Sequence, residues 1–171
     1  MDFFEVVKQR HSIRHFATTP VEREKLQKIL ATANQAPSAG NLQSFEIYVA
    51  SGLSTRLALA HCALGQSFIA QAPYSLVFCT RADLAESRYG RRGKELYAIQ
   101  DATIACSFAM LAATALGLGS VWVGAFDERA VGEILGSKKS ARPVAILPIG
   151  YTAESPVVTP RRSLTELVLE I

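Results

Sequence analysis

Hydrophobic positions switch along the chain between helical and strand-like spacing. Apolar side chains recur every three or four positions in segments that predict helices at about residues 2–10, 19–34, 54–64, 94–116 and 127–135. Alternating or continuous apolar runs predict strands at residues 45–49, 74–79, 120–123 and 144–150. Residues 81–93 are polar and show neither period, so they are predicted to form a mobile surface loop or a short lid.

The stretch from Ala102 to Phe126 contains no charged residue. Its length would allow a membrane span, but small and hydroxyl side chains are frequent and three glycines interrupt its second half. A buried helix followed by a buried strand is the favoured interpretation. Because this helix has no polar face, it must be covered on all sides, which a short chain achieves most easily at a subunit interface. We therefore predict a homodimer, with Ala109 in the interface.

Composition limits the function classes. Hydrophobic residues make up 49% of the 171 positions and charged residues 19%, as in a globular protein, and one domain over residues 1–171 is expected. The net charge of +3 is spread along the chain, so nucleic acid is not an expected partner. Three distant cysteines predict buried thiols rather than disulfides or a zinc site. The acidic N-terminus lacks a signal-peptide pattern, so the cytoplasm is the expected location, with no membrane partner.

Candidate chemistry begins at residues 10–16, Arg-His-Ser-Ile-Arg-His-Phe. Arg10, Ser12 and Arg14 offer a guanidinium and hydroxyl clamp for a phosphate, at the point where the first helix passes into a loop. A solvated basic turn is the alternative interpretation. Motifs of dinucleotide-binding folds, P-loops, serine hydrolases and zinc proteases are missing from the sequence. An enzyme without its own nucleophile or metal would need a cofactor to carry the chemistry.

Three other segments suit a phosphorylated cofactor. The loop Pro37–Gln43 offers hydroxyl, amide and backbone donors, and Arg161 with Arg162 adds positive charge. The segment Gly117–Ala125 combines small residues with Trp122, so that backbone N–H groups can approach a flat ring. Each segment alone also fits a plain turn, exposed charge or ordinary core packing.

Together these segments resemble the FMN-dependent nitroreductase family over nearly the whole chain. Arg10–Phe16 is similar to that family's N-terminal signature, and Ala36–Gln43 to its second motif, which lies before a strand. Asp101–Ala115 followed by Leu116–Phe126 is similar to its central helix and the next strand. The order and spacing of the three motifs carry the resemblance.

The resemblance implies an α+β fold, with helices around a mostly antiparallel sheet, and an intertwined homodimer with FMN at the subunit interface. Arg10 and Ser12 would hold the phosphate and ribityl chain, Arg14 the pyrimidine edge, and Arg161 or Arg162 would close on the phosphate. Further implied contacts come from the second motif, presented by the partner subunit, and from the glycine-bordered strand. The complete implied set is Arg10, His11, Ser12, Arg14, Pro37, Ser38, Ala39, Asn41, Gln43, Trp122, Val123, Gly124, Arg161 and Arg162.

The implied activity is a two-step hydride transfer from NAD(P)H through FMN to a nitroaromatic, a quinone or a similar small acceptor. Two alternatives stay open: a specialised flavin enzyme of the same family (a reductive dehalogenase, an oxidative dehydrogenase or a flavin-cleaving enzyme), and a flavin-binding protein without turnover. Many members carry an acid where Gly124 stands and a longer insertion near residues 81–93. The substrate lid is therefore expected to be reduced, and the choice between NADH and NADPH is left open.

Overall fold

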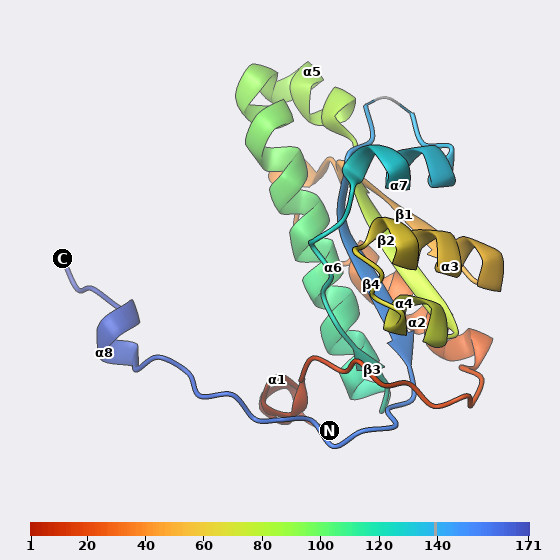
Figure 1. Ribbon diagram of the computed structural model, residues 1–171. Coiled ribbons are helices and arrows are strands. Elements are labelled where there is room, and N and C mark those ends of the chain that lie inside the picture. The colour runs from red at the N-terminus through yellow and green to blue at the C-terminus, as the bar shows by residue number, and fades with distance from the viewer. Residues whose placement is uncertain (139) are drawn as a thin grey trace.

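The computed structural model describes residues 1–138 and 140–171, and it contains one antiparallel sheet with the strand order β1–β2–β4–β3 (Figure 1). The strands are β1 Phe45–Ala50, β2 Tyr74–Thr80, β3 Gly119–Ser120 and β4 Pro143–Gly150. The helices are α1 Phe3–Gln9, α2 Arg23–Asn34, α3 Leu53–Cys62, α4 Phe68–Gln71, α5 Ala82–Arg92, α6 Ala98–Ala115, α7 Glu128–Leu135 and α8 Leu164–Leu167, with a 3₁₀ turn η1 Ala39–Asn41 and a π turn η2 Gly93–Tyr97. The predicted α+β fold with an antiparallel sheet is confirmed.

Helices cover both faces of the sheet (Figure 1). Successive side chains of a strand point to opposite faces, and in β2 Leu76 and Phe78 pack with α2 and α6, whereas Val77 and Cys79 pack with α3, α4 and α7. All four side chains are fully buried. Covering both faces explains why β2 and β4 are continuous apolar runs rather than alternating ones.

The prediction of a loop at residues 81–93 is wrong, because residues Ala82–Arg92 form helix α5. The helix has a non-helical residue at Gly90, with φ 57° and ψ −147°, a backbone conformation that essentially only glycine adopts. Gly93 packs so closely on the backbone of Ala85 that a Cβ there would overlap the Ala85 carbonyl. Only Ala85 of α5 is buried, so the sequence lacks the apolar repeat that would have marked a helix.

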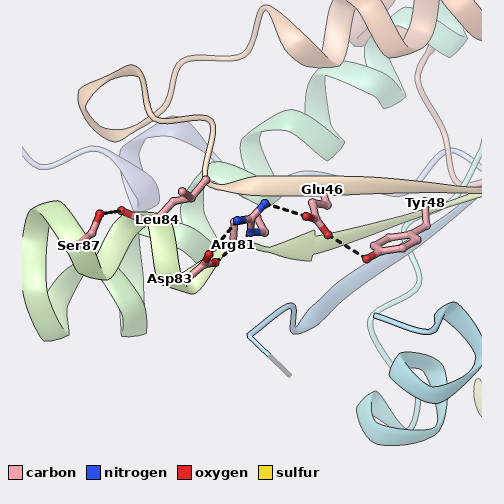
Figure 2. Close-up of polar contacts among 6 residues, drawn as sticks. All are labelled: Glu46, Tyr48, Arg81, Asp83, Leu84 and Ser87. Carbon is pink, nitrogen blue, oxygen red and sulfur yellow. Dashed lines mark hydrogen bonds and ion pairs between the residues drawn. The ribbon is translucent and has the colours of Figure 1, made fainter. Parts of the chain in front are cut away.

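Arg81 ties the start of α5 to β1, as Figure 2 shows. Its guanidinium donates to both carboxylate oxygens of Asp83, at 3.0 and 2.8 Å, and to Glu46 Oε1 at 2.9 Å. The hydroxyl of Tyr48 donates to the other oxygen of Glu46 at 2.9 Å. Burial and then the Glu46 carboxylate raise the pKa of Tyr48 to about 12, while hydrogen bonds from Arg81 lower the pKa of Asp83. This network fixes the direction in which α5 leaves the sheet.

Helix α2 begins at Arg23 with Glu22 as its N-cap, three residues later than predicted from Thr19 as the N-cap. Val21 is 5% exposed and belongs to the core, so the segment before α2 stays extended to bring this side chain inward. The backbone carbonyl of Glu22 accepts the first helical N–H groups, from Lys25 and Leu26.

Helix α6 resolves the choice between a membrane span and a buried helix. The continuous helical segment Ala82–Ala115 is long and apolar enough to cross a membrane by length and composition. However, α6 packs on α2 and on the sheet, with Ala102, Ala105 and Ala109 fully buried. The favoured interpretation as a core helix is therefore confirmed. The placement of Ala109 in an interface is wrong, since its side chain faces the core.

Two of the three cysteines are buried as predicted, and the third, Cys62, is half-buried. Burial raises the pKa of Cys79 to about 12, and it raises that of Cys106 well above its usual range. These two thiols are therefore protonated and unreactive at neutral pH.

Candidate active site

The segment 10–16 runs from the end of α1 across the edge of the sheet. Its apolar members point inward, because Ile13 and Phe16 are 5% and 8% exposed and pack together with Ala72. The Ile13 N–H donates to the carbonyl of Ser120 at 3.0 Å. Gly119 is required at this contact, since a Cβ there would approach the Ile13 side chain to 2.8 Å. The backbone is thus held by the sheet while its polar side chains face outward.

These polar side chains line one hollow of about 740 Å³. Arg10, Ser12 and Arg14 lie in its wall together with Arg161 from the C-terminal segment, and His11 is a further lining residue. Arg162 is not in this wall; its guanidinium donates to the carbonyl of Glu166 at 3.0 Å. The first motif and one of the two C-terminal arginines therefore come together.

Glu154, which belongs to none of the sequence motifs, organises this hollow. Its carboxylate accepts hydrogen bonds from the backbone N–H groups of Arg14 and His15. The Arg14 N–H is the main reason why the pKa of Glu154 is lowered, followed by the His15 N–H among the stabilising contacts. The carboxylate thus orients the backbone that presents the Arg14 side chain.

Glu154→Gln is expected to lower the thermal midpoint at neutral pH by an amount that shrinks in acid. A carboxyl whose folded pKa is lowered contributes stability above its unfolded pKa, and this stability is lost as the pH falls through the folded value. The difference between wild type and variant should therefore be full above pH 4.5, the ordinary value for this group, and diminish below it. Thermal melts across pH 3–7 measure it; a pH-independent difference would contradict the interpretation.

The second motif, Pro37–Gln43, forms a tight loop around η1. Its backbone takes the left-handed conformation at Asn41 (φ 57°) and Gln43 (φ 44°), which non-glycine residues rarely adopt. The hydroxyl of Ser38 accepts the Gln43 N–H at 2.9 Å and closes the loop. Strained backbone of this kind persists only where neighbouring groups hold it and is frequent at ligand sites.

The side chain of Asp101, in α6, holds this loop through hydrogen bonds. The carboxylate is 2% exposed and accepts the Ala39 N–H at 2.9 Å, the Ser44 N–H at 3.4 Å and the Ser44 hydroxyl. No cation pairs with it in the part of the chain that the structure describes. In the sequence Asp101 stands out only as the single charged residue of α6, at the start of the central-helix motif. Its role in holding the loop could not be predicted from that.

Replacing Asp101 with alanine is expected to cost about 2 kcal/mol of unfolding free energy, because buried donors around Ala39 and Ser44 would lose their acceptor. Asp101→Asn, which keeps one carbonyl oxygen, should cost less. Denaturant titration of both variants measures the difference. Equal stability of the alanine variant and wild type would show that these hydrogen bonds do not hold the loop in solution.

The third segment only partly forms a strand. The predicted strand 120–123 consists of the short β3 and an isolated pairing of Val123 with Ile146. Both backbone groups of Val123 bond to Ile146, at 2.9 and 3.0 Å, so they are committed to the sheet. Gly124 is exposed and lies beside the Trp122 indole. Of this segment, the Gly124 backbone is therefore the part that remains accessible.

Within one protomer the first and second motifs lie at opposite ends of α6. Asp101, near its beginning, holds the second motif, while the first motif is bonded to Ser120, which follows its end. A helix of 18 residues is about 27 Å long, and Figure 1 shows α5 and α1 at the two ends of α6. One copy of the chain therefore does not assemble the whole predicted set of site residues.

Comparison with known proteins identifies the family of this chain. Two overlapping segments, residues 7–61 and 50–151, match the model of the nitroreductase family. The chain belongs to the nitroreductase family. Among similar proteins, the NADH dehydrogenase of Thermus thermophilus is 30% identical, with 94% of this chain and 92% of the relative covered. The FMN reductase (NAD(P)H) of Bacillus subtilis is 32% identical, over 92% of this chain and 70% of the relative.

The fold of this nitroreductase-family chain is shared with solved structures. The NADPH:FMN oxidoreductase of Vibrio harveyi, determined in complex with NAD⁺, superimposes with a TM-score of 0.90 at 26% identity, covering 98% of this chain and 76% of that one. The family predicted from three short motifs is thus confirmed by sequence and by fold.

Proposed function

We propose that this protein is a homodimeric flavoenzyme that transfers a hydride from NAD(P)H through FMN to a nitroaromatic, a quinone or a similar small acceptor. It is an NAD(P)H-dependent oxidoreductase that uses FMN, the class to which the family and its named relatives belong. The choice of acceptor, the dimer and a cytoplasmic location are the further parts of the proposal, as is the assignment of residues 1–171 to one FMN-binding domain.

The observation that carries the proposal is the donor set of the hollow beside α1. Arg10, Arg14 and Arg161 line it, and among the described residues none of the three guanidiniums forms an ion pair with a carboxylate. The Glu154 carboxylate also lines the hollow, but it accepts hydrogen bonds from the backbone N–H groups of Arg14 and His15 instead. Guanidiniums without acidic partners are suited to bind a phosphate in bidentate fashion. The hydroxyl of Ser12 adds a donor for the phosphate or the ribityl chain. These residues fit FMN in chemistry, and a hollow of about 740 Å³ lies within the usual range for cofactor sites.

The proposed dimer would complete the site. Because the first motif lies at one end of α6 and the second at the other, antiparallel packing of α6 against α6 of a second copy would bring the two motifs together. Outward on α6 lie Ser107, which is exposed, and Leu111, which is half-buried. Apolar side chains on α1 also lack cover, with Phe3 63% and Phe4 81% exposed.

The C-terminal segment supports the same arrangement. It extends away from the body and contains the short helix α8 near its end (Figure 1). Its apolar side chains Val157, Leu164 and Leu169 are between 75% and 85% exposed. An extended apolar segment of this kind gains stability by packing on another surface. The proposed surface is the partner subunit.

Bound FMN would supply the redox chemistry, taking a hydride from NAD(P)H and passing electrons to the acceptor. Arg10 and Ser12 would bind its phosphate end, while the positive charge of Arg14 would favour negative charge at the pyrimidine edge of the ring. Ser38, Asn41 and Gln43 would orient the ring from the partner subunit. The exposed Gly124 backbone would allow close approach of the flavin ring. No side chain is assigned as an acid or a base.

An absorbance spectrum of the purified protein, followed by anaerobic titration with NADPH and NADH and then a quinone, tests the proposal. A yellow protein that is bleached by a reduced nicotinamide and recovers its colour with the quinone is the expected result. A yellow protein without turnover would leave only flavin binding. A protein that stays colourless after FMN is added would overturn the proposal.

A further inference from the structure

Helix α5 carries two arginines that are not neutralised by acidic neighbours. Of the basic residues in and after this helix, Arg91 pairs with Glu95 at 2.8 Å and Lys94 pairs with Glu86 at 3.0 Å. Arg88 and Arg92 pair with no carboxylate among the described residues, and both are exposed. Each donates instead to a neutral oxygen: Arg88 to the carbonyl of Gly40 at 3.3 Å, and Arg92 to the hydroxyl of Tyr97 at 3.0 Å.

Both guanidiniums are also positioned by aromatic rings. Arg88 lies 5.6 Å from the centre of the Tyr89 ring and Arg92 lies 5.5 Å from that of Tyr97. The two rings contact each other edge to face, with centroids 5.3 Å apart. Arg88, Tyr89, Arg92 and Tyr97 thus form one connected surface, the α5 arginine–tyrosine patch. Since each guanidinium has five N–H donors and uses one here, most donors remain available.

The patch borders the second motif. A Cβ on Gly40 would overlap the Tyr89 hydroxyl and approach the Arg88 guanidinium to 3.1 Å, so these side chains lie directly against the loop. Tyr97 also lines a hollow of about 500 Å³ together with Ser38, Ala39 and Asp101. A ligand that binds over the second motif and extends past its edge would therefore contact the α5 arginine–tyrosine patch.

We infer that the α5 arginine–tyrosine patch binds the 2′-phosphate of NADPH and makes the protein selective for NADPH over NADH. The inference rests on the proposed function, because it places the nicotinamide end of the dinucleotide at the shared site and its adenosine end at α5. A phosphate monoester carries close to two negative charges at neutral pH and accepts bidentate hydrogen bonds from guanidinium. Tyrosine faces beside the two arginines suit the adenine ring. NADH has the same adenine and pyrophosphate but lacks this phosphate.

The test compares Arg88→Ala, Arg92→Ala and the double variant with Arg91→Ala, which removes another exposed arginine of the same helix that already has an acidic partner. Calorimetric binding of NADP⁺ and NAD⁺ to the purified protein gives a selectivity ratio without turnover. Wild type is expected to bind NADP⁺ on the order of tenfold more tightly than NAD⁺, each single variant to lower this ratio, and the double variant to abolish it. Arg91→Ala should keep the wild-type ratio, and Arg88→Lys should retain part of it because the charge remains.

Several results would overturn the inference. They are equal affinity of wild type for the two nucleotides, an unchanged ratio in the double variant, and a loss of affinity that is the same for NADP⁺ and NAD⁺. The last of these would place the pyrophosphate rather than the 2′-phosphate at the patch. Raising the ionic strength should shrink the wild-type ratio, since exposed charges are screened.

Failure of this inference is distinguishable from failure of the proposed function. A wild-type protein that retains FMN and oxidises both nucleotides equally would overturn only the role of the patch. A wild-type protein that binds no FMN would overturn the proposed function, whatever the ratio of nucleotide affinities.

Discussion

Replacing Arg10 with alanine is expected to weaken FMN binding by roughly 2–4 kcal/mol, which corresponds to a loss of affinity between about 30-fold and 1,000-fold. The guanidinium lies in the wall of the hollow beside α1 and has no acidic partner among the described residues. A phosphate bound there would therefore receive the full strength of a charge-assisted hydrogen bond. Lys8 also lines this hollow.

Fluorescence titration of the apoprotein with FMN measures this effect. Arg129→Ala is a suitable control, since Arg129 lies on α7, is paired with Glu133 and has an 89% exposed side chain. The same titration separates the two C-terminal arginines. Arg161→Ala should weaken binding more than Arg162→Ala, because Arg161 lines the hollow and Arg162 does not. An unchanged affinity in the Arg10 variant would mean that the phosphate binds elsewhere.

The core strands could be predicted from the sequence because their burial is encoded locally. β2 and β4 are covered by helices on both faces, so nearly every side chain in them is apolar and the runs stand out without knowledge of their partners. β3 is different. It has two residues, and the pairing of Val123 with Ile146 depends on where β4 lies, which the sequence around residue 123 does not contain.

Helix α5 and the start of α2 show where local patterns fail. Most of the α5 surface is exposed, so its helical state leaves no apolar repeat, and Gly90 at its end suggested a loop. The Thr19–Pro20 pattern is a good helix start by itself, but burial of Val21 requires extended backbone just before α2. Tertiary packing overrides local propensity at both places.

The candidate site was predictable as motifs but not as a geometry. The first motif and Arg161 lie together in one hollow, while the second motif lies beyond the other end of α6. Glu154 and Asp101 act through backbone N–H groups, and such a role has no sequence signature. Single carboxylates of this kind become visible only when the backbone that they hold is known.

The same limitation explains the error at Ala109. A helix that is apolar all round has no polar face, so the sequence does not tell which side faces a partner. In the structure Ala109 is fully buried inside the protomer, whereas Ser107 is exposed on the outer side of α6. A charge at Ala109 would therefore disrupt the protomer itself, and Ser107 is the position at which the proposed interface can be tested.

Ser107→Glu is expected to separate the dimer and to release FMN. In a dimer formed by antiparallel α6 helices the new carboxylate would be buried without a cation, once in each subunit, which costs several kcal/mol per charge. The folded protomer should be unaffected, because within the described part of the chain the exposed Ser107 side chain donates only to the Thr103 carbonyl of its own helix. The dissociation constant of the dimer is therefore expected to rise by at least about 1,000-fold, a change of about 4 kcal/mol.

Light scattering coupled to size exclusion, with the FMN content of each peak, measures both consequences. Ser54→Glu is the matched control, since it introduces the same charge at an exposed position of α3, on the opposite face of the sheet from α6. A Ser107→Glu protein that remains a dimer would show that α6 does not form the interface. A monomer that binds FMN as tightly as wild type would show that one subunit suffices for the site. If the site is built from the two ends of α6, Ser107→Glu should lose the dimer and FMN together. The circular dichroism spectrum should still show intact helices.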